Sequence, residues 1–216
     1  MWKPSKRLRR SMEKALSRWT ACLHEAEPYL TRRGITIETG RAFSLGVVAS
    51  SDPGFEKYFG RLVIPYMDRL GPVGFQFRCI DDHSCKEANC PKYLQLDDQK
   101  VGFFNVLSLD SDEEVAHICE GEIDAITLSQ VVEGPVLAVS GVGKWLPHFQ
   151  YHLTGFERVV VWADGDSAGG KMSERIRDKV RNADVVSLPQ GEDVNSLYVT
   201  KGGDYIRSLY EEDPDV

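Results

Sequence analysis

Residues Val159–Gly170 read VVVWADGDSAGG, and this stretch decides the fold of the second half of the chain. Its apolar, mostly β-branched start predicts a buried strand. The strand ends at two aspartates, Asp164 and Asp166, which one glycine separates. A helix is expected directly afterwards, with Ser167 as its N-cap. A single Asp-x-Asp at a strand end is typical of a turn or a helix cap, so its interpretation depends on the rest of the chain.

From about residue 111, short apolar runs alternate with segments of helical periodicity. Strands are expected at 116–121, 135–141, 158–166 and 183–189, and helices at 122–132, 145–153 and 167–181. Alternation at this spacing predicts βαβ units, and therefore a parallel sheet with helices on its faces. The fold class expected for this half is α/β.

Three of the expected strands lead into acidic residues. Glu120 ends the first, Asp164 and Asp166 end the third, and Glu192 and Asp193 follow the last. Ligands of parallel sheets lie beyond the carboxyl ends of the strands, where these carboxylates would converge and repel one another. A hard divalent cation removes that repulsion. We therefore predict Mg²⁺ or Mn²⁺ at this edge, where two ions could assist phosphoryl transfer.

Glycines accompany these acids. Gly121 follows Glu120, and Gly165 separates the two aspartates. Because glycine has no Cβ, both are expected to let the backbone and a phosphate approach closely. The N-terminus of the helix that begins after Asp166 would also favour an anionic phosphate.

The first half of the chain has a different pattern of apolar and polar residues. Residues 5–33 have helical periodicity, with Pro28 expected to break or restart the helix. Residues 62–78 predict a strand, a turn at DRLG and a return strand. We expect a basic N-terminal helix at 1–24, a mixed α+β subdomain at 25–110, and an α/β domain with a C-terminal helix at 111–216.

Charge is distributed unevenly along the 216 residues. The net charge is −7, which argues against a nucleic-acid binder that relies on overall charge. Residues 1–18 nevertheless contain seven Lys or Arg and one acid, so this segment is either a solvated tail or a contact for a phosphate backbone. No apolar run approaches the ~20 residues that cross a bilayer, and no secretory signal is evident. A cytoplasmic protein without a membrane partner is expected.

Four potential zinc ligands lie within twelve residues. They are Cys79, His83, Cys85 and Cys90, in the spacing C-x3-H-x-C-x4-C. Such ligands suit tetrahedral Zn²⁺, but the spacing is not that of a standard finger or ribbon. A cysteine-rich loop without metal is therefore ranked ahead of a zinc site.

Several motifs together resemble a known family. ICEGEIDAITLSQ (118–130), VVVWADGDSAGGKM (159–172) and LPQGEDVNSL (188–197) resemble the Toprim domain in its DnaG-type primase form. Upstream, YLTRRGI (29–35), FSLGVV (43–48), GRLVIPYMDRLGPVGFQFR (60–78) and PKYL (91–94) resemble the segments that precede Toprim in these primases. The match covers roughly residues 25–210 and is typical of a reduced, phage-like RNA polymerase core.

The resemblance implies a DNA primase, which makes short RNA primers on single-stranded DNA from NTPs. Its metal ligands would be Glu120, Asp164 and Asp166, with Asp193 assisting. The residues that would bind nucleotide or DNA are Arg33, Arg78, Lys92 and Lys100. A replicative helicase and a separate zinc-binding module for template recognition are the implied partners, and the host cytoplasm is the implied location if a phage encodes the chain.

The sequence departs from the family pattern in two places. Asn195 stands where the family has a second acid, which could weaken one metal position, and a cysteine-bearing insertion follows Arg78. Two other functions therefore stay open. The acidic patch would also support phosphodiester cleavage in a Toprim nuclease. The chain could instead be a catalytically inactive, DNA-binding accessory factor.

Overall fold

The structure of the chain is a computed structural model that describes residues 3–49, 52–97, 99, 102–139, 145–146 and 148–211. Two compact units divide the chain, Met1–Gly102 and Phe103–Val216. Residues 103–110 thus belong with the second unit, where the Phe104 N–H donates to the Ala138 carbonyl at 2.9 Å. None of the helices in the described ranges is long and apolar enough to cross a membrane.

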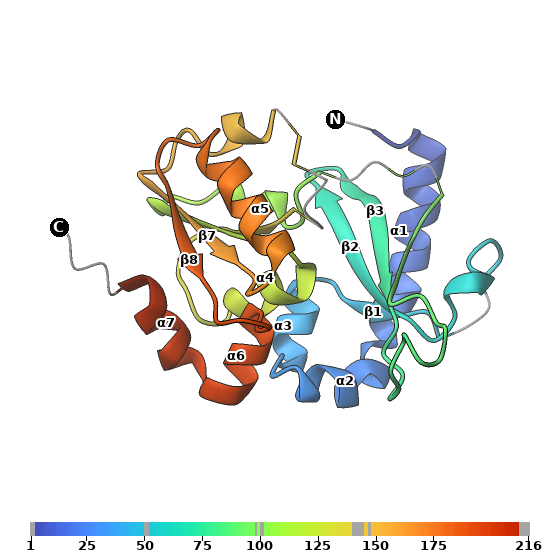
Figure 1. Cartoon of the computed structure of the whole chain (residues 1–216). Helices are drawn as coiled ribbons and strands as arrows, with labels where there is room; N and C mark the ends of the chain where they lie inside the picture. Colours follow the sequence, from blue (N-terminus) through green and yellow to red (C-terminus); the bar gives the residue numbers. More distant parts are fainter. Residues whose placement is uncertain are drawn as a thin grey trace. The chain divides into compact units, whose positions relative to one another are not determined.

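The first unit is built on an antiparallel sheet in the order β1-β2-β3-β4 (Figure 1). Its strands are β1 (Gly46–Val47), β2 (Leu62–Asp68), β3 (Gly71–Arg78) and β4 (Tyr93–Gln95). Leu62 pairs with Arg78 and Asp68 with Gly71, so β2 and β3 form the hairpin that the sequence predicts, with its turn at DRLG.

Helical segments accompany this sheet. They are α1 (Lys6–Ala21), η1 (Leu23–Ala26), α2 (Glu27–Arg32), α3 (Ile37–Ala42) and η2 (Glu56–Tyr58). Pro28 lies in the first turn of α2, where its missing N–H has no helical partner to lose, so it starts a helix. The hydrophobic face of α1 buries Met12, Leu16 and Trp19 in a core with Phe75 and other sheet residues. The basic segment is therefore a packed helix over residues 6–21, and the interpretation as a solvated tail is wrong there.

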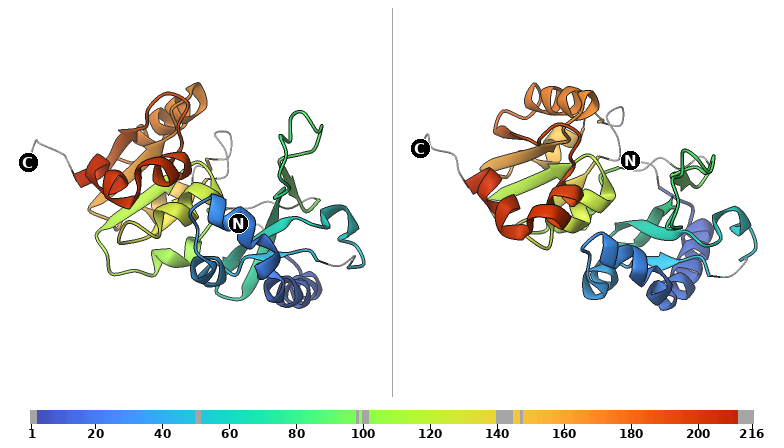
Figure 2. Two further views of the ribbon diagram at one scale, coloured as in Figure 1. Left: turned by 90° about the horizontal axis from the view of Figure 1, so that it is seen from below. Right: turned by 60° about the horizontal axis from the view of Figure 1, so that its bottom comes forward.

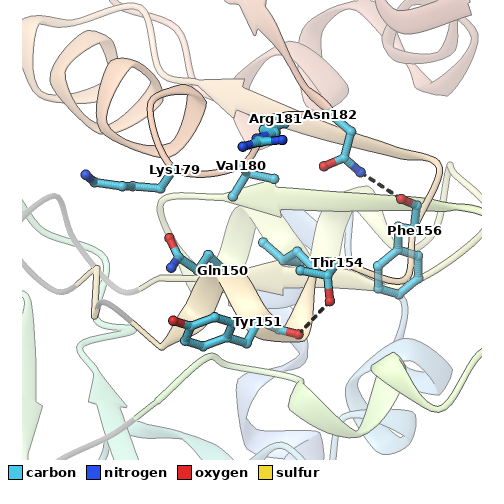
Figure 3. Close-up of a pocket in the computed structure, with 9 residues that line it drawn as sticks. Gln150, Tyr151, Thr154, Phe156, Lys179, Val180, Arg181 and Asn182 are labelled. Atoms are coloured by element: carbon cyan, nitrogen blue, oxygen red, sulfur yellow. Dashed lines mark hydrogen bonds between the residues drawn. The ribbon is translucent and has the colours of Figure 1, made fainter.

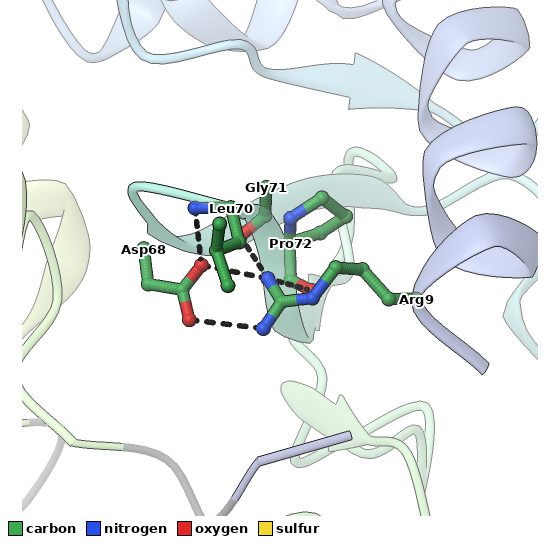
Figure 4. A network of polar contacts seen from close by, with 5 residues as sticks. All are labelled: Arg9, Asp68, Leu70, Gly71 and Pro72. Carbon is green, nitrogen blue, oxygen red and sulfur yellow. Dashed lines mark hydrogen bonds and ion pairs between the residues drawn. The ribbon is translucent and has the colours of Figure 1, made fainter. Parts of the chain in front are cut away.

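Arg9 of α1 is fixed to the β2–β3 hairpin (Figure 4). Its guanidinium donates to Asp68 Oδ1 at 2.7 Å and to Asp68 Oδ2 at 2.9 Å. The same side chain donates to the carbonyls of Gly71 and Pro72. One of the seven basic side chains of the N-terminal segment is thus engaged in holding the helix on the sheet.

The second unit contains a parallel sheet in the order β6-β5-β7-β8, which confirms the predicted α/β class. Its strands are β5 (Val115–Cys119), β6 (Val136–Ala138), β7 (Arg158–Ala163) and β8 (Ala183–Ser187). From β5 the chain runs to one neighbour, β6, and later returns to the other neighbour, β7. The strand order therefore reverses between β5 and β7, which makes their carboxyl ends a topological switch point.

Helices cover both faces of this sheet (Figure 2). The second unit contains η3 (Val106–Leu109), α4 (Glu122–Leu128), η5 (Phe149–His152), α5 (Ser167–Arg177), α6 (Val194–Lys201) and α7 (Gly203–Glu211). The helix expected at 145–153 is shorter, because only the 3₁₀ turn η5 forms among the described residues of that stretch. Met172 of α5 packs against Ile118 and Val161 on one face.

The opposite face of the sheet carries a buried polar pair. The indole N–H of Trp162 donates to His117 Nδ1 at 3.2 Å, and the Tyr210 ring of α7 contacts both side chains. Burial lowers the pKa of His117 to about 4, so its imidazole is neutral near pH 7 and can accept this hydrogen bond. The alternation of β7 side chains between the two faces thus fixes which residues meet α5 and which meet α7.

Candidate functional site

The predicted acids interact with one another at the carboxyl ends of β5 and β7. Glu120 follows β5, and Asp164 follows β7 at the switch point. Burial raises the pKa of Asp164, the negative charges of Asp124, Glu120, Asp193 and Asp166 raise it as well, and together they bring it to about 8. Since electrostatic effects of this kind act over short distances, the structure brings the four predicted metal ligands, Glu120, Asp164, Asp166 and Asp193, to one edge of the sheet.

Two carboxylate oxygens at this edge are buried without a hydrogen-bond partner. They are Glu120 Oε2 and Asp164 Oδ1. Burial raises the pKa of Glu120 as well, with a contribution from the charge of Asp166. Buried oxygens that no protein group satisfies are costly, and a hard divalent cation would satisfy both. The residues present therefore fit a Mg²⁺ or Mn²⁺ ion.

Asp166 and Asp193 also cap the helices that follow them. Asp166 Oδ1 accepts hydrogen bonds from Ala168 N at 2.7 Å and Gly169 N at 2.8 Å. The prediction that Ser167 is the N-cap is wrong. Asp166 has an extended backbone and is the N-cap, whereas Ser167 is the first residue of the helix. Asp193 forms a capping box with Ser196 at the start of α6. Helix capping thus holds both carboxylates in place.

Gly165 is required by the backbone of the neighbouring loop. A Cβ at this position would lie 1.8 Å from the Pro189 carbonyl oxygen. Gly165 N donates to the Glu192 carbonyl at 2.8 Å, and Gly191 N donates to the Gly165 carbonyl at 2.8 Å. The sequence predicts that Gly165 lets a phosphate approach the backbone closely. In the structure residues 189–192 make this close approach instead, and they bring Asp193 towards Asp164.

The two ends of the parallel sheet each have a pocket. One of about 410 Å³ lies at the carboxyl ends of β7 and β8 and is lined by Asp164, Gly165 and Asp166, among others. Another, of about 400 Å³, is lined by residues that precede these strands, including Tyr151, Lys179 and Asn182 (Figure 3). Asp164 and Asp166, but not Glu120 or Asp193, thus line the pocket at the end where ligands of parallel sheets bind.

Asp124 is a member of the acidic group that the sequence reasoning missed. It lies buried in the first turn of α4, and its charge contributes more to the raised pKa of Asp164 than that of any other acid. Asp124 follows Glu120 by only four residues, in the first turn of the helix that begins two residues after Glu120. That spacing was the available signal.

Asn195, the departure from the family pattern, is buried between α4 and α6. Its Nδ2 donates to Thr127 Oγ1 at 2.8 Å, and its backbone N–H donates to Asp124 Oδ1 at 3.0 Å. The Thr127 hydroxyl donates its own hydrogen to the Ile123 carbonyl at 2.8 Å. Thr127 Oγ1 can therefore still accept a hydrogen bond, and the side-chain amide of Asn195 donates it.

The predicted basic residues lie in the first unit. Arg33 and Arg78 line a pocket of about 400 Å³, together with Tyr29, Arg32, Cys79 and residues 81–85; we call it the arginine pocket. The Arg78 guanidinium is buried over the Tyr93 ring, 4.7 Å from the centroid, and its Nε has no hydrogen-bond partner. Lys92 is exposed just before β4, whereas Lys100 lies outside the described residues.

The cysteine-bearing insertion brings its four candidate ligands together. One ligand atom from each of Cys79, His83, Cys85 and Cys90 lies within 4.8 Å of the other three. This arrangement goes against ranking a metal-free loop ahead of a zinc site. The unusual spacing was misleading because the loop folds back on itself, with Cys90 N donating to the Cys85 carbonyl at 2.8 Å.

Comparison with known proteins supports this architecture. A family profile described as Toprim-like matches residues 117–198. The Gene 57 protein of Mycobacterium phage D29 is 35% identical over 153 residues, which are 68% of this chain and 95% of that protein. The DNA primase of Pasteurella multocida is 25% identical over 169 residues, which cover 73% of this chain but 29% of that primase.

A solved structure of the DnaG primase catalytic domain bound to ssDNA has the same fold. Its TM-score is 0.72 at 18% sequence identity, covering 95% of this chain and 80% of that one. The parallel sheet and the acids at its switch point define a Toprim protein. With the antiparallel unit ahead of it, the chain has the fold of the DnaG primase catalytic core, and it belongs to the DnaG-type primase family.

Proposed function

We propose that the chain is a DNA primase, a nucleotidyltransferase that synthesises short RNA primers from NTPs on single-stranded DNA. One observation carries the proposal: the buried, unpartnered oxygens of Glu120 and Asp164 lie among mutually repelling acids at the switch point of a Toprim sheet. The names of the related primases and the ssDNA-bound catalytic domain support the choice of reaction and template.

In this proposal Glu120, Asp164 and Asp166 bind the divalent metal, and Asp193 assists from the loop after β8. The bound metal would stabilise the phosphate oxygens and promote attack by the primer 3′-hydroxyl. The capping bonds of Asp166 and Asp193 hold these carboxylates in fixed orientations. The N-terminus of α5, next to Asp166, favours an anionic phosphate.

The basic residues of the first unit would bind nucleotide or template. Arg33 and Arg78 line the arginine pocket, and Arg78 has an unsatisfied buried Nε. Guanidinium groups form strong hydrogen bonds with phosphate, so this pocket suits a phosphate of the substrate or of the DNA backbone. Lys92 and Lys100 are proposed to extend the same interaction. A replicative helicase and a separate zinc-binding module are proposed as partners.

A priming assay tests the reaction. The chain is incubated with single-stranded DNA, labelled NTPs and Mg²⁺ or Mn²⁺, with and without a replicative helicase. Glu120→Gln and Asp164→Asn should each lower RNA synthesis by roughly 100-fold or more, because each removes a proposed metal ligand. Asp178→Asn is the matched control, since this exposed acid lies at the far end of α5.

The products separate the competing functions. Extension products that depend on Glu120 and Asp164 support a primase, whereas shortening of labelled DNA indicates a nuclease. DNA binding without incorporation at any metal concentration indicates an accessory factor. Full activity of both variants, with circular dichroism spectra equal to that of the unmodified protein, contradicts the assignment of the site.

A further inference from the structure

The connection between β3 and β4 carries a group of side chains that primer synthesis does not use. Residues 79–92, which we call the cysteine loop, join two antiparallel strands that pair directly, Arg78 with Tyr93. Hairpin connections usually have 2–5 residues, so this loop is unusually long. Its four potential ligands are Cys79, His83, Cys85 and Cys90.

The distances within the cysteine loop match those around a tetrahedral zinc ion. Two sulfurs bound to one Zn²⁺ at ~2.3 Å lie ~3.8 Å apart, and a bound sulfur and imidazole nitrogen lie ~3.6 Å apart. In the structure Cys79 Sγ is 3.6 Å from Cys90 Sγ and 3.6 Å from His83 Nε2. One ligand atom from each of the four residues lies within 4.8 Å of the others, so a single ion can reach all of them.

The loop has little else to stabilise its conformation. Of residues 79–92 only Cys79 is buried, and none is a member of the hydrophobic cluster that contains Trp19 and Phe75. The backbone is nonetheless folded, with Cys90 N bonded to the Cys85 carbonyl and Cys79 N bonded to the Lys92 carbonyl. A segment that buries so little apolar surface needs another source of stability, and a structural zinc site supplies it.

A basic side chain lies against the cluster. Arg61 Nη2 donates to Cys90 Sγ at 3.4 Å, and Arg61 Nη1 donates to the Pro91 carbonyl at 2.8 Å. Three thiolates and a neutral imidazole around Zn²⁺ have a net charge of −1, which the guanidinium offsets. Hydrogen bonds to ligand atoms are a regular feature of protein metal sites.

A disulfide explains the cluster less well. The sulfurs of Cys79 and Cys90 are 3.6 Å apart, and all three cysteines of the loop are free. A disulfide requires ~2.05 Å and would leave one cysteine and His83 without a role. Three sulfurs and one imidazole nitrogen form a ligand set that selects Zn²⁺ over Mg²⁺ or Ca²⁺.

We propose that Cys79, His83, Cys85 and Cys90 bind one structural Zn²⁺, which holds the cysteine loop as a wall of the arginine pocket. Cys79, His83 and Cys85 themselves line that pocket together with Arg32 and Arg33. Metal binding by the loop does not depend on primase activity. Only the consequence for ligands of the pocket rests on the proposed function.

Metal content and spectroscopy test the site. Protein purified under reducing conditions from zinc-supplemented cells should contain stoichiometric zinc by mass spectrometry. Cys85→Ser should lower the zinc affinity at least about tenfold, whereas Cys22→Ser, a cysteine outside the cluster, should leave it unchanged. Metal-free protein titrated with Co²⁺ should show the intense d–d bands of a tetrahedral thiolate site, and His83→Cys should keep these bands but shift them.

Limited proteolysis tests the structural role. Lys86 is exposed in the middle of the cysteine loop, so trypsin should cleave after it at least about tenfold faster once a chelator has removed the zinc. Added Zn²⁺ should restore protection in the Cys22→Ser protein but not in Cys85→Ser.

Zinc at background level in the purified protein would overturn the proposal, as would equal zinc affinity of Cys85→Ser and the unmodified chain. Cleavage that the chelator leaves unchanged would overturn the structural role. None of these readouts requires RNA synthesis, so they are independent of the proposed function.

Discussion

Asp124 Oδ1 accepts a hydrogen bond of 3.0 Å from the backbone N–H of Asn195. The bond joins the first turn of α4, which follows Glu120, to the first turn of α6, which follows Asp193. This hydrogen bond thereby connects the segment after β5, which carries Glu120, to the segment after β8, which carries Asp193. A buried carboxylate that accepts from a neighbouring helix has a defined orientation, and this one also repels Asp164.

Asp124→Asn should weaken the metal site while preserving the fold. The asparagine carbonyl oxygen can still accept the bond from Asn195, but the negative charge beside Asp164 is lost. We expect the affinity for Mn²⁺ to fall roughly tenfold, as for other residues that orient or support ligands. Isothermal titration with MnCl₂ measures this. Asp112→Asn, an exposed acid of the same unit, is the control, and equal affinities of the two variants would contradict a role for Asp124.

Asp164→Asn should stabilise the metal-free protein at high pH. The pKa of Asp164 is about 8 in the folded protein and 3.8 in its ordinary environment, so the folded state retains a proton that the unfolded state loses. The contribution of Asp164 to stability is therefore full below pH 3.8 and is lost as the pH rises to about 8. Asparagine cannot ionise and avoids this loss.

In EDTA at pH 9, we expect Asp164→Asn to raise the free energy of unfolding by roughly 1–3 kcal/mol, and by much less at pH 4. Added Mn²⁺ should stabilise the unmodified protein more than the variant, because the ion requires the ionised carboxylate. Thermal unfolding at both pH values measures the difference. The same shift in Tm at pH 4 and pH 9 would show that ionisation of Asp164 does not control stability.

Gly165→Ala should destabilise the second unit. The new methyl group would overlap the Pro189 carbonyl oxygen and push away the loop that carries Asp193. We expect a loss of about 2–4 kcal/mol in the free energy of unfolding. Gly170→Ala is a matched control in α5, where nothing lies within 4 Å of the added Cβ, and it should be neutral or stabilise by up to ~1 kcal/mol. If urea unfolding ranks the two variants equally, the packing argument for Gly165 is wrong.

Asn195→Asp should destabilise the metal-free protein, although the family pattern has an acid at this position. Thr127 Oγ1 has already donated its hydrogen to Ile123, so a carboxylate at 195 would face an acceptor and add a buried charge beside Asp124. We expect a loss of about 2–4 kcal/mol at pH 8 and a smaller loss at pH 4.5, where the new group is protonated more easily.

Chemical unfolding at both pH values measures this change. Asn182→Asp loses a comparable amide donor, to the Phe156 carbonyl, at a half-buried position away from the acids, and it should cost less. Unchanged stability of Asn195→Asp at pH 8 would mean that the site accommodates a further acid without metal.

Much of the fold and part of the site follow from local sequence. The apolar runs before Glu120 and Asp164 define strands, and the glycines and acids after them define turns. Because parallel strands place their carboxyl ends at one edge, Glu120 and Asp164 could be predicted to meet. The β2–β3 hairpin followed in the same way from two apolar runs around DRLG.

Other features depend on partners that lie far away in the sequence, and only the tertiary structure decided them. Asp124 acquires its importance from packing near Asp164, and Asn195 from the hydroxyl of Thr127, 68 residues before it. Gly165 is required by the Pro189 carbonyl, which no local pattern indicates. The ligand spacing from Cys79 to Cys90 matched no standard motif, yet the return of β4 beside β3 closes the loop and brings the ligands together. The sequence thus determined which segments form the strands of the parallel sheet, with ends that differ by up to three residues from those observed, because these segments arise from local hydrophobicity and backbone preference. The tertiary structure determined which side chains share a site, because burial and charge interactions depend on distance in space.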